Sequence, residues 1–234
     1  MNAGKRSYQL DNFNLPRDVT LARDEAIEKA CRTYREPGFQ FDPGLFDLAP
    51  PVRLEGYFIS GRYFSTIAEE VRLACTPRRP LSRQADDYAR RISATPNAVS
   101  VHLRRGDYLS PTIAHLDPLP LDYYQRALAA LEERVDGQLT CFVFTDDPAY
   151  AAEHMGFLPN RVLVDGDINN PWESLIQMRL CRRHVIANST FSWWGAWLSE
   201  TSERVVIAPR DWHTPAYMPS MDTRDVCPEE WILV

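Results

Sequence analysis

From residue 98 onward, short apolar runs alternate with amphipathic segments, and this rhythm constrains the fold more than any other feature. A short apolar run predicts a buried strand, and an amphipathic stretch predicts a helix that packs by one face. Strands separated by helices form β-α units that build a parallel sheet. The predicted strands are 98–104, 139–145, 161–164, 184–187 and 204–208, and the predicted helices are 121–134, 148–155, 172–181 and 191–199.

We therefore predict an α/β protein whose residues 96–234 form a Rossmann-like domain with a parallel sheet. The hydrophobic pattern of residues 1–95 is different, because a Gly/Pro-rich middle separates the periodic segments. We interpret residues 1–95 as a smaller and incomplete N-terminal region. The helices predicted there are 18–31, 63–74 and 82–92, and the strands lie near 38–41 and 52–58.

The charge balance excludes several classes of function. The 26 basic and 32 acidic residues give a net charge of −6, which argues against a nucleic-acid groove or a polybasic membrane surface. We see no N-terminal signal pattern and no uninterrupted apolar run long enough to span a bilayer, so we expect a cytoplasmic protein. Five widely spaced cysteines without ligand spacing predict reduced thiols and no zinc site.

Ligands of such sheets bind beyond the carboxyl ends of the strands, so residues after each apolar run are candidates for a site. His102 and Arg104 share one face of the first predicted strand, and Arg105 begins the following loop. Two guanidinium forks match phosphate oxygens and can neutralise a pyrophosphate leaving group. The alternative is an ion pair with Asp107 or another carboxylate, which we favour for an isolated arginine pair.

A strand that runs directly into a helix supplies a second candidate, at residues 186–198. Free backbone N–H groups at the start of that helix, together with the hydroxyls of Ser189, Thr190 and Ser192, could face a phosphate. The alternative is that these residues only cap the helix. The three tryptophans of the helix belong to the core in our interpretation, and Gly195 allows a neighbouring element to approach.

Carboxylates occur at two further positions. Asp146 and Asp147 end an apolar strand, where one of them could bind a ribose or base, or could cap the helix that Pro148 begins. Asp165 and Asp167 flank a glycine and imitate the Asp-x-Asp of metal-dependent glycosyltransferases. We favour a turn for this second pair, because an arginine pair already suffices for one pyrophosphate, and we expect no metal site.

The segments His102–Tyr108, Phe144–Asp147 and Ile186–Leu198 together resemble the α-1,2-fucosyltransferases of glycosyltransferase family 11, and shorter matches extend over essentially the whole chain. The resemblance implies a GT-B-like, two-domain enzyme that is metal-independent and inverting. It would need no cofactor and would move L-fucose from GDP-fucose to the 2-hydroxyl of a galactoside. Residues 1–95 would be the acceptor side, and residues 96–234 would bind the donor.

The resemblance also implies roles for individual residues. Arg104 and Arg105 would hold the pyrophosphate, with Arg104 acting in catalysis. The remaining donor contacts that it implies are His102 and Asp146 at the nucleoside, Ser189, Thr190 and Ser192 at the phosphates, and Glu173 at the guanine. An inverting reaction needs a base for the acceptor hydroxyl, and the loop after the arginines offers Asp107, His115 and Asp117. Position favours Asp107, whereas the ordinary pKa of histidine favours His115.

The chain departs from the family pattern at its beginning. The family opens with a segment of the form Gly-Gly-Leu-Gly-Asn-Gln-Met-Phe-Gln-Tyr, about 40 to 50 residues before the match at residues 6–13, whereas this chain begins Met1-Asn2-Ala3-Gly4-Lys5. We therefore expect intact donor binding and weaker catalysis, with a GDP-sugar-binding protein that has no turnover as the alternative. The expected acceptor is a galactose-containing glycan or a lipid-linked oligosaccharide, which leaves peripheral association with the cytoplasmic membrane open.

Overall fold

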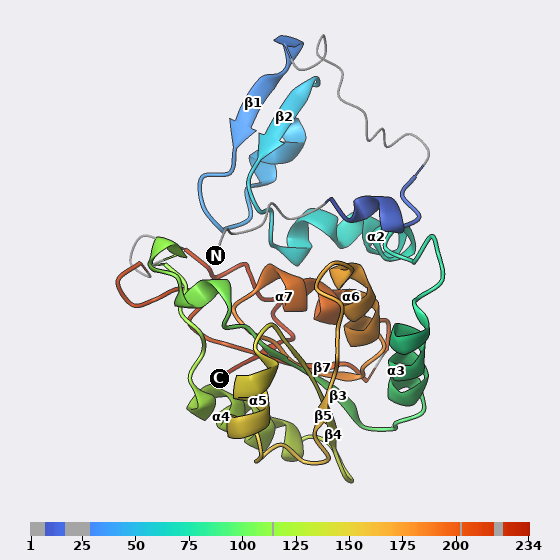
Figure 1. The fold of residues 1–234 in the computed structure, drawn as a ribbon. Coiled ribbons are helices and arrows are strands. Elements are labelled where there is room, and N and C mark those ends of the chain that lie inside the picture. The colour runs from blue at the N-terminus through green and yellow to red at the C-terminus, as the bar shows by residue number, and fades with distance from the viewer. Residues whose placement is uncertain (1–7, 17–28, 114, 202, 218–221) are drawn as a thin grey trace.

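The computed structural model describes residues 8–16, 29–113, 115–201, 203–217 and 222–234. Its central feature is a six-stranded parallel sheet in the order β5-β4-β3-β6-β7-β8, with helices on both faces (Figure 1). The predicted α/β class with a Rossmann-like parallel sheet is confirmed. The strands are β3 (Ala98–Leu103), β4 (Thr140–Thr145), β5 (Val162–Leu163), β6 (Arg183–Val185), β7 (Val205–Ala208) and β8 (Ile232–Leu233).

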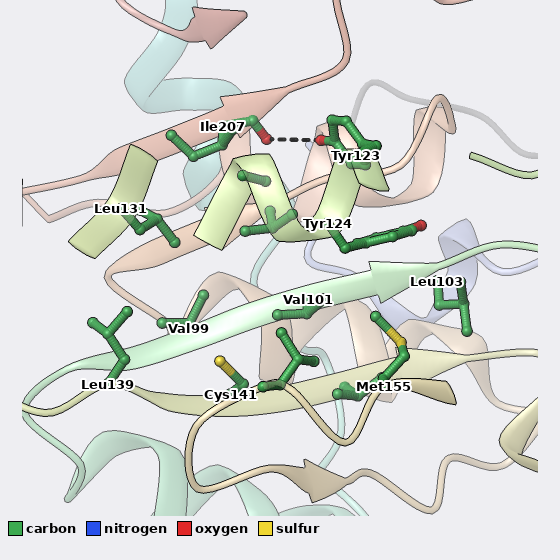
Figure 2. Packing of buried hydrophobic residues seen from close by; sticks show 14 of the residues in the cluster. Val99, Val101, Leu103, Tyr123, Tyr124, Leu131, Leu139, Cys141, Met155 and Ile207 are labelled. Carbon is green, nitrogen blue, oxygen red and sulfur yellow. Dashed lines mark hydrogen bonds between the residues drawn. The ribbon is translucent and has the colours of Figure 1, made fainter. Parts of the chain in front are cut away.

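The helices that connect these strands lie close to their predicted positions: α4 (Leu121–Glu132), α5 (Pro148–His154), α6 (Pro171–Arg179) and α7 (Thr190–Trp197). Helix α4 covers one face of the sheet, where Tyr124 and Leu131 pack among the β3 and β4 side chains Val101 and Cys141 (Figure 2). On this face the Tyr123 hydroxyl donates hydrogen bonds to the carbonyl oxygens of Ile186, at 2.6 Å, and Ile207, at 3.4 Å. These bonds fasten α4 across two neighbouring strands.

Helices α6 and α7 cover the opposite face, and the tryptophans of α7 belong to that core as predicted. Trp193 is fully buried, and its ring stacks on Trp197 with centroids 6.1 Å apart. A Cβ added at Gly195 would lie 2.9 Å from Cβ of Met178, which is a residue of α6. The glycine therefore permits the close approach of α6 to α7, as the sequence predicted.

The N-terminal region holds a separate two-stranded parallel sheet, β1 (Arg32–Arg35) and β2 (Val52–Glu55), which stands away from the main sheet (Figure 1). The strand predicted near 38–41 was wrong: residues 38–40 form a bend, and the strand lies at β1, whose mostly exposed Arg-Thr-Tyr-Arg residues give no apolar run. The segment predicted as helix 63–74 begins as a 3-10 helix (Gly61–Ile67) and continues as α2 (Ala68–Ala74).

Helix α3 (Arg83–Ser93) matches its prediction, and the amide of Gln177 in α6 donates to the Ala85 carbonyl in α3 at 3.0 Å. Most of the helix predicted at 18–31 and the first residues of the 6–13 match lie outside the described residues. The division into regions 1–95 and 96–234 stays a proposal. All five cysteines are free thiols, and among the described residues no helix has the length and apolarity needed to cross a membrane.

Candidate functional site

The chain reverses its direction across the sheet between β3 and β6, and the candidate site lies at this point. After β3 the chain adds β4 and β5 on one side, and then returns to add β6, β7 and β8 on the other. In parallel sheets, ligands bind at the carboxyl edge beside such a reversal. Arg104 and Arg105 follow β3 directly, and Asn188 and Ser189 follow β6 closely. The predicted arginine pair and the predicted helix start therefore lie on either side of this part of the carboxyl edge, which we call the crevice.

Three carboxylates neutralise the two arginines. Arg104 donates to Asp107 at 2.7 Å and to Asp146 at 3.0 Å, and Nε of Arg105 lies 3.2 Å from Asp147. The backbone N–H of Arg105 also donates to Asp146, at 2.9 Å. The arginine side chains are only 23% and 19% exposed, so their charges are less hydrated than those of surface arginines. The ion-pair alternative therefore holds in this structure, at a place where a phosphate could join or replace the carboxylates.

The two aspartates that follow β4 have different roles. The last residues of β3 and β4 pair in register, which brings Asp146 beside the arginines. Asp147 caps α5, because its carboxylate accepts the N–H of Tyr150 at 3.1 Å. The guanidinium of Arg105 lies 3.4 Å above the Tyr150 ring, which fixes its plane. The helix-cap alternative therefore holds for Asp147, and the nucleoside contact of Asp146 stays a prediction.

The hydroxyls at the start of α7 are not equivalent. Ser192 is 2% exposed, and its hydroxyl accepts the N–H of Ala187 at 3.2 Å and donates to the Ser189 carbonyl at 3.3 Å. This internal bonding shapes the loop between β6 and α7. The Ser189 hydroxyl does not cap the helix, and Thr190 is half-buried. Ser189 and Thr190 therefore remain the hydroxyls that a phosphate at this helix start could use.

Asn188 holds three loops around the crevice, a role that we did not assign from the sequence. Its carbonyl accepts the Tyr108 hydroxyl at 2.8 Å, which closes a contact between the loops after β3 and β6. Its side-chain amide donates to the carbonyls of Asp117 and Trp212, both at 3.2 Å. The signal in the sequence was the position of an asparagine just after a buried strand, but its partners are distant along the chain.

His102 is buried beside the arginines, with its ring centroid 5.7 Å from that of Phe191 in α7. Burial, with a smaller effect of the Arg104 charge, lowers the pKa of His102 to about 3, so the ring is neutral near pH 7. Its Nδ1 has no hydrogen-bond partner among the described residues. A buried polar atom without a partner is costly, and it is therefore a candidate contact for a ligand.

Glu173 lies at the start of α6 and is engaged elsewhere. Its carboxylate accepts the backbone N–H of Ser82 at 2.6 Å and the Ser82 hydroxyl at 3.0 Å. These bonds join α6 to the beginning of α3. The guanine contact stays a prediction, and it would require Glu173 to leave Ser82 or to share it.

The three candidate bases occupy different surroundings. Asp107 forms the short pair with Arg104, whereas Asp117 contributes its backbone carbonyl to Asn188. The ring of His115 lies 5.8 Å from that of His213 and 6.1 Å from that of Tyr217. This loop is therefore bonded to Asn188 and to the segment of His213, and the role of each candidate base stays a prediction.

The Asp165 and Asp167 carboxylates form local hydrogen bonds. Asp167 accepts from the backbone N–H of Asn169 at 2.8 Å and from the side-chain amide of Asn170 at 2.7 Å, and these bonds lower its pKa. Asp165 accepts from Gln84 at 2.8 Å. This geometry agrees with the turn interpretation. Across the parts of the chain that the structure describes, no group of three or more His, Cys, Asp or Glu side chains could hold a metal ion.

Comparison with known proteins gives a family match over most of the chain. The model of glycosyl transferase family 11 matches residues 49–234. An O-antigen biosynthesis glycosyltransferase, WbnK of Escherichia coli, is 39% identical over 131 residues, which cover 53% of this chain and 42% of that protein. An alpha-1,2-colitosyltransferase of Escherichia coli is 33% identical over 189 residues, which cover 78% of this chain and 62% of that protein.

A more distant relative is galactoside alpha-(1,2)-fucosyltransferase 1 of Saimiri boliviensis boliviensis, with 26% identity over 65% of this chain and 44% of that protein. The matches with all three relatives span between 42% and 62% of the relatives' own lengths.

Proposed function

The chain belongs to glycosyl transferase family 11, and from its site we propose that it transfers L-fucose from GDP-fucose to the 2-hydroxyl of a galactoside, with inversion and without a metal. The names of two relatives, an alpha-1,2-colitosyltransferase and a galactoside alpha-(1,2)-fucosyltransferase, support the linkage and the class of sugar. The acceptor in this proposal is a galactose-containing glycan, free or lipid-linked.

The observation that carries the proposal is the pair of half-buried guanidiniums at the point where the strand order reverses. Arg104 and Arg105 stand on the β3 side of the crevice, and the start of α7, with Ser189 and Thr190, stands on the β6 side. A pyrophosphate between them would meet two guanidiniums, free backbone N–H groups and two hydroxyls. These groups suit a diphosphate, and none of them needs a metal ion.

The reaction follows from this placement. As the glycosidic C–O bond breaks, negative charge develops on the departing diphosphate, where Arg104 and Arg105 stabilise it. The acceptor 2-hydroxyl attacks C1 of the fucose from the opposite side and loses its proton to a base. We assign that base to His115, because the Asp107 carboxylate is already paired with the guanidinium of Arg104 at 2.7 Å.

The identity of the donor sugar is the most specific part of the proposal. Colitose lacks the 3-hydroxyl of fucose, and one missing hydroxyl is strongly discriminated only where the protein hydrogen-bonds it. GDP-fucose and GDP-colitose should therefore be compared as donors at equal concentration. If transfer from GDP-colitose is faster, the donor in this proposal becomes GDP-colitose, and the rest of the proposed reaction is unchanged.

A transfer assay with labelled GDP-fucose and the disaccharide Galβ1-3GlcNAc, with and without EDTA, tests the proposal. We expect a trisaccharide whose galactose is substituted at the 2-position, formed equally well with EDTA present. Loss of transfer in EDTA and its recovery with Mn²⁺ would instead implicate a metal, with Asp165 and Asp167 as the ligands to examine. GDP binding without transfer of either sugar would identify a GDP-sugar-binding protein.

A further inference from the structure

A row of aromatic and imidazole rings extends from the crevice to the N-terminal region. The ring of Tyr57 stacks on Phe39, with centroids 5.8 Å apart and planes inclined by 29°. Phe39 lies 5.0 Å from His213, and His213 lies 5.8 Å from His115. Tyr217 adjoins His115 at 6.1 Å. Segments distant along the chain therefore contribute to one continuous row of rings.

The inner end of this row is anchored to the candidate site. Asn188 lies in the loop between β6 and α7, and its side-chain amide donates a hydrogen bond to the carbonyl of Trp212. Trp212 precedes His213 in the chain. His115 in turn holds the segment that contains His213, because its carbonyl accepts the N–H of Thr214 at 3.1 Å and approaches Nδ1 of His213 at 3.3 Å. The two imidazoles therefore lie next to the crevice, and the two outer rings lead away from it.

The row changes character along its length. Its outer ring, Tyr57, is 69% exposed although it stacks on Phe39. Its middle ring, His213, is 5% exposed, and its Nε2 has no hydrogen-bond partner among the described residues. The exposed face of Tyr57 is separated from this buried polar atom by the single ring of Phe39. Ligand sites likewise combine apolar area with a few polar groups.

A saccharide matches this combination. The C–H face of a pyranose ring packs on an aromatic ring, and its hydroxyls bond to imidazole nitrogens. None of the five residues is an arginine or a lysine. Their side chains therefore offer the phosphates of a nucleoside diphosphate no permanent positive charge. The arrangement therefore suits a neutral glycan better than a second nucleotide.

We propose that this row, Tyr57, Phe39, His213, His115 and Tyr217, is the acceptor subsite. The galactose lies at the imidazoles, and the sugar linked to it stacks on Tyr57. The inference rests on the proposed function, to which it adds the path of the acceptor. Tyr57 and His213 become determinants of acceptor specificity that do not touch the donor.

The test compares Tyr57→Ala and Tyr57→Phe with the unaltered chain. In the transfer assay we expect Tyr57→Ala to raise KM for Galβ1-3GlcNAc about fivefold or more, while KM for GDP-fucose changes less than about twofold. Tyr57→Phe should retain the unaltered KM for the disaccharide, because stacking needs the ring and not the hydroxyl. Phe46→Ala is the matched control, since Phe46 is similarly exposed, at 63%, and lies outside the row.

Saturation-transfer difference NMR with Galβ1-3GlcNAc in the presence of GDP gives a readout that does not need turnover. We expect saturation of the GlcNAc protons in the unaltered chain and its loss in Tyr57→Ala. If this pattern appears without any fucosyl transfer, the subsite stands and the proposed activity fails. An unchanged pattern in Tyr57→Ala, or no saturation of the disaccharide in the unaltered chain, would overturn the inference.

Discussion

At the scale of single residues, the carboxylate contacts of Arg104 and Arg105 hold the two guanidiniums in place. Isolated surface ion pairs contribute little, but these guanidiniums are only 23% and 19% exposed and face three carboxylates at 2.7–3.2 Å. The positions of the arginines and of Asp146 could be predicted, because each follows a buried strand. The partner of Glu173 could not, because Ser82 lies 91 positions away in the chain and no local pattern links the two.

A substitution at Gly106 tests whether GDP binding depends on the position of the Asp146 carboxylate. A Cβ at this position would lie 2.7 Å from Oδ2 of Asp146, the oxygen that pairs with Arg104. We expect Gly106→Ala to displace that carboxylate and to weaken GDP binding by about three- to tenfold, as misplacing one charged contact should do.

The matched control for this substitution is Gly156→Ala, because an added Cβ there meets nothing within 4 Å. Isothermal titration with GDP and a thermal melt of both variants check the expectation. Equal GDP affinities for the two variants would show that the Asp146 position does not matter for binding.

At the scale of elements, apolar runs predicted strands β2 to β7 and missed β1 and β8. Every residue of β3 is buried, and its prediction succeeded. Strand β1 is an exposed Arg-Thr-Tyr-Arg segment, and β8 is a two-residue strand at the edge of the sheet, so neither produces an apolar run. Hydrophobic periodicity in the sequence indicates which residues are buried. The position of a strand with exposed side chains depends instead on pairing with a distant segment, which a local pattern does not reveal.

The two central strands carry buried histidines that make stability depend on pH. Burial is the main reason that the pKa values of His102 in β3 and His184 in β6 fall to about 3, whereas an unfolded histidine titrates near 6.5. Below about pH 6.5 the unfolded chain therefore binds protons that the folded chain does not. The free energy of unfolding should be highest above that pH and should fall as the pH falls toward 3.

His184→Gln tests the contribution of one of these residues. We expect its melting temperature to fall less between pH 7 and pH 5 than that of the unaltered chain, even if the variant is less stable overall. His154→Gln, at a side chain that is 38% exposed, should follow the unaltered chain. Parallel pH profiles for His184→Gln and the unaltered chain would contradict the assignment.

At the scale of the whole molecule, the order of the strands decides where a ligand can bind. The reversal between β3 and β6 brings together segments about 85 residues apart and places the crevice where the loops after these two strands meet. The sequence predicted the β-α units and the residues at their carboxyl ends, but not the strand order or the row of rings that adjoins the crevice. The account therefore makes one central claim: the diphosphate of the donor binds at Arg104 and Arg105.

Isothermal titration of GDP into Arg104→Ala, Arg104→Lys and Arg126→Ala tests that claim most directly. Loss of a bidentate charged contact should raise the Kd of Arg104→Ala roughly tenfold to a hundredfold, and Arg104→Lys should fall between it and the unaltered chain. Arg126 is a half-exposed arginine that pairs with Asp122 on α4, and its loss should leave GDP binding unchanged. Unaltered GDP affinity in a folded Arg104→Ala variant would contradict the account.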